Sequence, residues 1–328
     1  VTFEPLEDTL RVARALQADL PLRPEIASKA ERGFRLFQQM PQQPARAGRS
    51  PVVPGMRPQA AFVAVALDCI GQLQRNEAGA RVGDDPEFVH QARVAIRRLR
   101  SALRLWGPLL PPGFREAFSP RWRDLAQLLG QARNLDVFVT ETLPPMQAVF
   151  AETPALGRLA HLAERRRQHW HREIRAAFEA PEFAALVLSF TAALYALPPD
   201  VSLVSLDDFL RRRLRRFARE VKAMADACSG HPAAHHRLRI AFKRLRYALE
   251  FAAPLLPAGK VRRYGVATAE MQALLGAMND LAVAEALVAE LRQRRTNDLV
   301  HGWLTGQAVL LHNLLPAALD GFLEARPP

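Results

Sequence analysis

Residues 90–104 read His-Gln-Ala-Arg-Val-Ala-Ile-Arg-Arg-Leu-Arg-Ser-Ala-Leu-Arg, and residues 236–249 read His-Arg-Leu-Arg-Ile-Ala-Phe-Lys-Arg-Leu-Arg-Tyr-Ala-Leu, 146 positions later. In the first stretch a histidine and four arginines follow one another at steps of 3, 4, 3 and 4 residues. A helix has about 3.6 residues per turn, so these five side chains share one narrow face. The intervening apolar residues predict an opposite face that packs inward. Both stretches therefore predict amphipathic helices.

The basic faces of these helices form two stripes. The first stripe is His90, Arg93, Arg97, Arg100 and Arg104, and the second stripe is His236, Arg239, Lys243 and Arg246. No Asp or Glu interrupts residues 88–115 or 227–249. An ordinary solvated helix face mixes charges of both signs. We therefore predict that both stripes bind an anionic partner, and that the two histidines contact it, because an imidazole N–H can donate to a phosphate oxygen.

The composition agrees with a polyanionic partner. The chain has 328 residues, a formal net charge of +12 and 45 Lys or Arg residues, and only four of these are lysines. A guanidinium group grips phosphate oxygens in pairs, so this usage suits a phosphate-rich ligand, although a genome that favours arginine codons would explain it equally well. The charge is spread along the whole chain. The stripes, and not the bulk charge, mark the expected site.

Cysteine content and hydropathy indicate a cytoplasmic protein. Cys69 and Cys228 are too few and too far apart for a disulfide framework or a zinc site, and both are expected to be core thiols. No stretch approaches 18 uninterrupted apolar residues and no signal peptide opens the chain, so we expect no membrane insertion. The chain begins at Val1 and not at methionine, which is typical of a piece of a longer protein.

Apolar residues recur at helical spacing along almost the whole chain, and strand signals are nearly absent. We expect short helices over 6–20 and 28–40, followed by a flexible Pro- and Gly-rich linker over 41–58. The longer helices are expected over 58–78, 86–107, 113–150, 154–180, 182–197, 203–228, 233–253, 258–295 and 298–325. Helix breaks are expected after Gly130 and Gly276, where Asn134 and Asn279 would either cap the next turn or contribute to binding directly.

The offset of 146 residues continues without a gap beyond the stripes. Pro108-Leu109-Leu110-Pro111 matches residues 254–257, and Leu128-Leu129-Gly130 matches residues 274–276. Such a match implies two copies of one supersecondary unit. We predict an all-α fold of two four-helix bundles related by a pseudo-two-fold axis, with a short helical N-terminal extension. The expected boundaries are 1–57 for the extension and linker, 58–180 for the first half, 181–200 for a connecting helix and 201–328 for the second half.

The paired motif His-x-x-Arg-(Val/Ile)-x-x-(Arg/Lys)-Arg-Leu-Arg-x-x-Leu resembles the CHAD family, the conserved histidine α-helical domain. The resemblance covers about residues 58–325. It implies paired helical bundles whose shared basic surface binds inorganic polyphosphate, and in this sequence it assigns that role to the first and second stripes. The copies differ at the outer end of the stripe, where Glu250 corresponds to Arg104.

CHAD domains often follow a CYTH, or triphosphate tunnel, domain. Residues 24–33 resemble the connector of such two-domain proteins. The acidic and basic strands of a tunnel domain are not in this chain, so any triphosphatase activity would belong to a separate domain. The family resemblance also suggests association with polyphosphate granules.

Other cations could extend the predicted site. Arg98 lies off the first stripe and is expected either to pair with an acid on a neighbouring helix or to lie at the rim of the site, and Arg244 holds the same position in the second copy. A further basic helix precedes the second stripe, and one more basic run offers two residues a turn apart. These additional candidates are Arg212, Arg216, Arg219, Lys222, His161 and Arg165.

The sequence shows no catalytic constellation. It has no Gly-rich phosphate loop, no readable Ser/His/Asp grouping and no carboxylate cluster for a metal, so we expect neither catalysis nor a metal or other cofactor. Two other functions remain open. Sequence-independent nucleic-acid binding would use the same charge, but only Tyr247 offers an aromatic ring at the stripes. A histidine phosphotransfer protein would also use a helical bundle with an exposed histidine.

Overall fold

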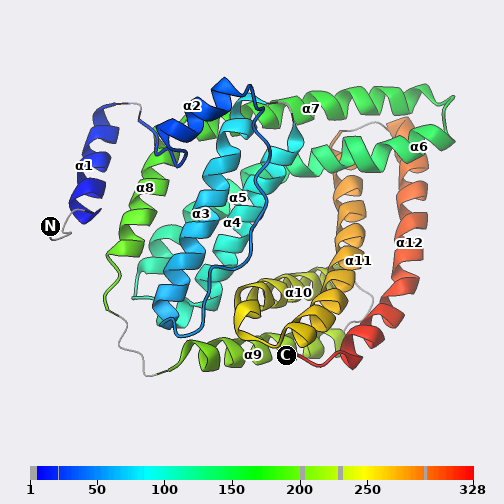
Figure 1. Cartoon of the computed structure of the whole chain (residues 1–328). Helices are drawn as coiled ribbons and strands as arrows, with labels where there is room; N and C mark the ends of the chain where they lie inside the picture. Colours follow the sequence, from blue (N-terminus) through cyan, green and yellow to red (C-terminus); the bar gives the residue numbers. More distant parts are fainter. Residues whose placement is uncertain (1–5, 21, 84, 200–203, 228–231, 292–293) are drawn as a thin grey trace. The chain divides into compact units, whose positions relative to one another are not determined.

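The protein is helical throughout the part of the chain that the computed structural model describes, which is residues 6–20, 22–83, 85–199, 204–227, 232–291 and 294–328 (Figure 1). Within these ranges no strand occurs, and the prediction of an all-α fold is confirmed. The α-helices are α1 (Leu6–Asp19), α2 (Lys29–Phe37), α3 (Pro58–Val82), α4 (Pro86–Leu105), α5 (Phe114–Val137), α6 (Leu143–Val149), α7 (Pro154–Glu179), α8 (Pro181–Tyr195), α9 (Leu206–Asp226), α10 (Pro232–Ala252), α11 (Ala258–Glu290) and α12 (Arg294–Glu324).

Proline and capping residues explain where several helices begin. Proline is the first residue of α3, α4, α7, α8 and α10, a position where its missing N–H costs no helical hydrogen bond. Asp85 caps α4, because its Oδ1 accepts a hydrogen bond of 2.8 Å from the backbone N–H of Glu87. These local signals fix the start of the helix that carries the first stripe.

The expected single helix over 113–150 is interrupted. Helix α5 ends at Val137, a π-helical turn covers Phe138–Thr142, and α6 follows. Pro144 and Pro145 have no N–H to donate to the preceding turn, so regular α-helical bonding cannot continue there. The hydroxyl of Thr140 instead donates to the Asp136 carbonyl at 2.8 Å.

The expected helix breaks after Gly130 and Gly276 are wrong. Helix α5 continues through Gly130 and Asn134, and α11 continues through Gly276 and Asn279. A glycine inside a helix weakens it by about 1 kcal/mol but does not end it when tertiary packing supports the segment. Neither asparagine therefore acts as a cap.

The chain forms two compact units. The first combines Val1–Gln131 with Trp170–Leu206, and the second combines Ala132–His169 with Asp207–Pro328. Helices α5 and α7 thus contribute residues to both units. The expected boundaries of the two halves stay predictions. So does the internal duplication, although η1 (Gly107–Leu109) and η3 (Ala253–Leu255), two short 3-10 turns, lie 146 residues apart.

The first unit is built on α3, which packs against α4 and also contacts α8, while α8 packs against α1. Its core is aromatic. The rings of Phe62 and Trp106 lie 6.1 Å apart, and those of Trp122 and Phe190 lie 5.4 Å apart, all four side chains being fully buried. Burial of these rings holds α3, α4, α5 and α8 together. Cys69 also lies buried in this core and forms no disulfide, whereas Cys228 lies outside the described residues.

The second unit is built on α11, which packs against both α10 and α12. Phe242 of α10 and Tyr264 of α11 both contact Phe322 of α12, at ring distances of 4.7 and 5.4 Å. Helix α11 is long and apolar enough to cross a membrane, by length and composition alone. Helices α7 and α8 meet the same criterion only when the bent pair is taken as one span. Within this unit α11 is a packing helix between two partners.

The segment over 41–57 has no regular secondary structure, but it is tied to α3. The buried Asn76 accepts from the backbone N–H of Ala45 at 2.9 Å and donates to the Ala45 carbonyl at 2.8 Å. Val52 is buried as well. The segment therefore lies along the first unit and differs from the flexible linker that we expected.

Candidate functional site

The first stripe lies on the solvent side of α4. The opposite side of this helix buries Phe88, Ile96 and Leu99, with the other core residues of the helix. His90, Arg93, Arg97 and Arg100 are half-buried and Arg104 is exposed. The helical spacing of the sequence thus separates a core side from a basic side, as the period of 3.6 residues requires.

Arg98 takes the first of its two expected roles. Its side chain is fully buried, and Nη1 lies 3.0 Å from Asp68 Oδ2 and 3.0 Å from Gln72 Oε1, both on α3. A buried guanidinium with these partners is a structural ion pair. Arg98 is therefore not at the rim of a binding surface. The expectation that it extends the candidate site is wrong.

Helix α5 runs beside the first stripe. A Cβ added to Gly130 would lie 3.6 Å from Nε of Arg93, so the guanidinium of Arg93 lies over this glycine in ordinary van der Waals contact. A Cβ at position 130 would therefore fit beside Arg93 without moving it. At Gly276, 146 residues later, an added Cβ would meet no heavy atom of the described residues within 4 Å.

The outer end of the first stripe opens into a hollow of about 280 Å³ between α4 and α5. Four arginines line it, and two of them, Arg115 and Arg123, were not among the candidates. The lining residues are Arg100, Leu103, Arg104, Arg115, Glu116, Ser119, Pro120 and Arg123. Burial lowers the pKa of Arg100, and the nearby charge of Arg123 lowers it further, while Asp124 acts in the opposite direction. Cations are thus crowded at this end of the stripe.

The second stripe lies on α10. His236 and Arg246 are exposed, and Arg239, Lys243 and Arg244 are half-buried. Nη1 of Arg246 donates to Oε1 of Gln272 on α11 at 2.8 Å. The stripe residues again lie away from the side of the helix that buries Leu238, Phe242, Leu245 and Leu249.

Two aromatic side chains near the second stripe lie inside the unit. Tyr247 is only 3% exposed, and the Arg246 guanidinium carbon lies 5.7 Å from its ring centre. His235, next to the exposed His236, is buried with its ring 4.6 Å from that of His312. Burial lowers the pKa of His235, and His312 lowers it further. Only one of the two adjacent histidines therefore faces solvent.

The additional candidates on α9 are exposed. They are Arg212, Arg216, Arg219 and Lys222. Arg216 forms an ion pair of 3.0 Å with Glu220 one turn later, and Arg212 donates to the Asp208 carbonyl. Burial lowers the pKa of the neighbouring Arg213, as does the charge of Arg216. The α9 helix is linked to η3, because Arg211 donates to the Leu255 carbonyl at 3.4 Å.

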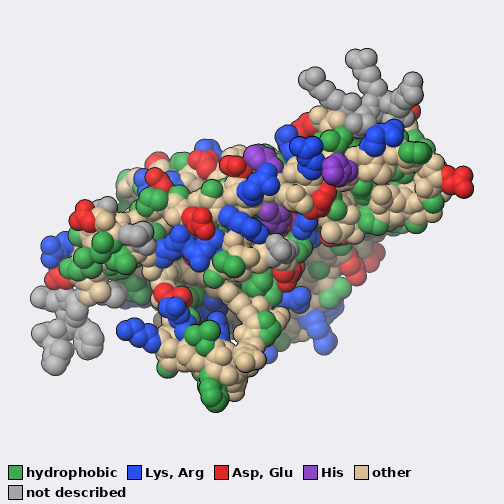
Figure 2. Space-filling view, turned by 90° about the horizontal axis from the view of Figure 1, so that it is seen from above, with side chains coloured by type: hydrophobic (Ala, Val, Ile, Leu, Met, Phe, Trp, Pro, Cys, Tyr) green, Lys and Arg blue, Asp and Glu red, His purple; other side chains and the backbone are tan. Residues whose placement is uncertain are grey.

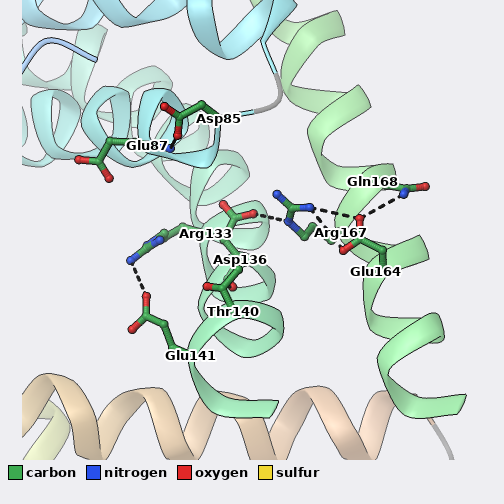
Figure 3. A network of polar contacts seen from close by, with 9 residues as sticks. All are labelled: Asp85, Glu87, Arg133, Asp136, Thr140, Glu141, Glu164, Arg167 and Gln168. Carbon is green, nitrogen blue, oxygen red and sulfur yellow. Dashed lines mark hydrogen bonds and ion pairs between the residues drawn. The ribbon is translucent and has the colours of Figure 1, made fainter. Parts of the chain in front are cut away.

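His161 and Arg165 are exposed on α7, where the nearby polar network is structural (Figure 3). Nε of Arg167 donates to the fully buried Asp136 at 2.7 Å, and its Nη1 lies 3.2 Å from Glu164. Burial alone would lower the pKa of Arg167, but the hydrogen bonds and charges of these two acids outweigh it, and the pKa is raised. This network fixes α7 to the end of α5.

Charge alone does not mark the site. Basic and acidic side chains both lie on the face drawn in Figure 2, with histidines among the basic ones. Among the residues described, no group of three or more His, Cys, Asp or Glu is arranged to hold a metal ion. The ordered placement of cations along α4 and α10 remains the distinctive feature.

Comparisons with known proteins identify the class to which this fold and these stripes belong. The CHAD domain matches residues 64–289 of the chain. The crystal structure of the CHAD domain from the plant Ricinus communis superposes with a TM-score of 0.77 at 31% sequence identity, covering 88% of this chain and 99% of that chain. The chain therefore belongs to the CHAD family, as the paired motif predicted.

A more distant structure shares the fold. PptA from Streptomyces chartreusis superposes with a TM-score of 0.60 at 17% identity, covering 82% of this chain and 99% of that chain. Among curated protein sequences no match is found.

Proposed function

We propose that this CHAD protein binds inorganic polyphosphate without catalysing a reaction on it, through the first and second stripes. The observation that carries the proposal is the placement of both stripes on the solvent sides of α4 and α10, opposite their buried apolar sides. Membership of the CHAD family supports it. Most of the cations are arginines, which bind phosphate oxygens in pairs.

The side chains favour polyphosphate over nucleic acid. Sequence-independent binding of single strands uses aromatic side chains on which bases stack. Phe242 and Tyr247, the aromatic residues between positions 236 and 249 besides His236, are both buried, and Tyr247 lies beneath the guanidinium of Arg246. A ligand that offers only phosphate oxygens needs no such platform.

A competition titration tests the proposal. Labelled polyphosphate is bound to the protein at one salt concentration and displaced with unlabelled polyphosphate, duplex DNA or RNA at equal phosphate concentration. We expect polyphosphate to displace the label at the lowest concentration. Displacement by DNA or RNA at a lower concentration would contradict the proposal.

Charge reversal in the first stripe supplies the matched comparison. Arg97→Glu with Arg100→Glu is expected to weaken binding at least about tenfold, because each lost charge-assisted contact is worth about 1.5–3 kcal/mol. The control variant, Arg11→Glu with Arg14→Glu, changes charge by the same amount on α1. If both variants lose the same affinity, binding reflects bulk charge and the stripes are not the site.

Two further expectations belong to this proposal. The purified protein should release no phosphate from polyphosphate or nucleoside triphosphates, with or without magnesium, because the stripes carry no carboxylates to position a metal ion. In the cell it should lie in the cytoplasm with polyphosphate granules. The second expectation would be contradicted if a fluorescent fusion does not co-localise with these granules. It would also be contradicted if the fusion still co-localises with them after charge reversal in both stripes.

A further inference from the structure

The hollow at the outer end of the first stripe combines residues from two helices. Arg100 and Arg104 belong to α4, and Arg115, Ser119 and Arg123 belong to α5, where spacings of four residues place them on one face. One carboxylate, that of Glu116, lines the hollow with them. Asp124 forms an exposed ion pair of 3.1 Å with Arg123, a type of contact that stabilises little and exchanges readily. Cations clearly outnumber acids at this point.

The shape of the turn between α4 and α5 brings Arg115 into position. A Cβ added to Gly107 would lie 3.0 Å from Nη1 of Arg115 and 3.1 Å from its Cδ. The side chain of Arg115 therefore folds closely over this glycine. A Cβ at position 107 would be tighter against Arg115 than an ordinary contact, so the Arg115 side chain would have to shift by a few tenths of an ångström.

The second copy lacks this arrangement. At the offset of 146 residues, Arg115 corresponds to Val261, Arg123 to Ala269 and Arg104 to Glu250, and Gly107 corresponds to Ala253. Of the four arginines only Arg100 has a cationic counterpart, Arg246. The four-arginine hollow is thus a feature of the first copy alone.

We propose that this hollow binds the terminal phosphate of a polyphosphate chain, so that the protein recognises a chain end as well as the chain interior. The inference rests on the proposed function. A terminal phosphate carries up to about two negative charges near pH 7, as a phosphate monoester does, whereas an internal phosphate carries about one. Four converging guanidinium groups suit the more highly charged group, and an open stripe with one cation per turn suits the interior. Burial lowers the pKa of Arg100 and the charge of Arg123 lowers it further, and a phosphate in the hollow would oppose both effects by favouring the charged guanidinium.

The test compares chains of one defined length whose two ends are either free or blocked as amides. Blocking removes an ionisable oxygen from each terminal phosphate and leaves the interior unchanged. The wild-type protein is expected to bind the free-ended chain at least about tenfold more tightly, the effect of losing one charge-assisted hydrogen bond. The variant Arg115→Gln with Arg123→Gln should bind free and blocked chains equally, at the wild-type affinity for the blocked chain.

Two controls separate end recognition from loss of charge. The variant Arg262→Gln with Arg263→Gln removes two exposed cations from the first part of α11, and it should keep the preference for free ends. Gly107→Ala requires the Arg115 side chain to shift by a few tenths of an ångström without changing the net charge, and it should reduce that preference in part. Thermal unfolding of each variant verifies that it is folded.

The outcomes are distinct. If wild type binds both chains equally, or if the two double variants behave alike, the end site is refuted while polyphosphate binding stands. If wild type binds neither chain, the proposed function fails together with the end site.

Discussion

Arg97 and Arg98 are adjacent in sequence and have opposite environments. Arg98 is fully buried against Asp68 and Gln72, whereas Arg97 is half-buried in the first stripe. Removing one partner of a buried ion pair leaves the other uncompensated and typically costs about 3–5 kcal/mol. Arg98→Ala is therefore expected to lower the free energy of unfolding by that amount, measured by urea denaturation.

The matched variant Arg97→Ala should change stability by less than about 1 kcal/mol. It should weaken polyphosphate binding, whereas folded Arg98→Ala protein at low temperature should bind nearly as wild type does. A large stability loss in Arg97→Ala, or a larger binding loss in Arg98→Ala, would contradict these roles.

Glu77 on α3 makes the stability of the first unit depend on pH. Burial raises its pKa from 4.5 to about 7, against the opposing effect of Arg23. Oε1 lies 3.8 Å from Arg23 and 3.9 Å from Arg81, so neither contact is a close hydrogen bond. A carboxyl group with a raised pKa holds its proton longer in the folded state. The contribution of Glu77 to the free energy of unfolding is therefore most favourable below pH 4.5, and it falls as the pH rises towards 7.

Glu77→Gln removes that dependence. At pH 8 the variant should be more stable than wild type by at most about 3 kcal/mol, the amount that corresponds to the raised pKa, in which the opposing charge of Arg23 is already included. At pH 4.5 the two proteins should be nearly equal. Urea denaturation at both pH values measures the difference, with Glu182→Gln, an exposed position on α8, as the control. If Glu77→Gln raises the free energy of unfolding equally at both pH values, ionisation of Glu77 is not the cause of the stabilisation.

At the scale of single residues, the sequence predicted the stripes better than the hollow. The stripes repeat at helical spacing without an acid, and that pattern needs no knowledge of packing. Arg115 and Arg123 stand next to Glu116 and Asp124, so locally they resemble an ordinary mixed-charge face. Only the packing of α5 against α4 shows that they converge with Arg100.

At the scale of elements, the segment over 41–57 depends on one buried side chain. Asn76 makes two hydrogen bonds to Ala45 from a fully buried position and a third to the Gln72 carbonyl. Asn76→Ala leaves the backbone groups of Ala45 without these partners, at a cost of about 1–3 kcal/mol. We expect trypsin to cut this segment much faster in the variant, at Arg46 or Arg49.

Limited proteolysis followed by mass spectrometry of the fragments measures this effect. The control is Gln127→Ala, an exposed change on α5, which should leave the cleavage rate unchanged. Cleavage of wild type as fast as the Asn76→Ala variant would mean that the segment is not held by this residue.

Element boundaries followed the sequence wherever proline or a capping residue marks them. Helices α3, α4, α8 and α10 begin at prolines, and the predicted ends lie within a few residues of the observed ones. The π-helical turn over 138–142 was not predicted, because apolar periodicity runs through it and only the bonding around Pro144 and Pro145 reveals it. The expectation of helix breaks at Gly130 and Gly276 overestimated how much one glycine destabilises a packed helix.

At the scale of the whole molecule, we expect both stripes to act on one long polyphosphate chain. After the first contact the second becomes intramolecular and has a high effective concentration, so affinity should rise steeply once a chain can reach both stripes. Reversal in one stripe should weaken binding, and adding Lys243→Glu and Arg246→Glu should abolish it. Isothermal titration across a series of chain lengths and salt concentrations measures both effects, and the log–log salt plot should be linear and steep.

The same titration series can also contradict cooperation between the two stripes. If triphosphate binds as tightly as a long chain, or if reversal of the second stripe changes nothing, the two stripes do not cooperate. A shallow salt dependence would argue against ion release as the source of affinity.

The assignment of chain segments to the two compact units has a consequence for biosynthesis. The first unit needs Trp170–Leu206 as well as Val1–Gln131, and α8, which packs against α1 and α3, lies in that later segment. A ribosome delivers the chain from the N-terminus at about 5–20 residues per second. The apolar sides of α1 and α3 therefore lack their partner helix α8 for several seconds, because residues 132–169 must leave the ribosome before it. During this interval the nascent chain exposes surface that chaperones recognise, and a ribosome stalled within α7 would hold a first unit that cannot close.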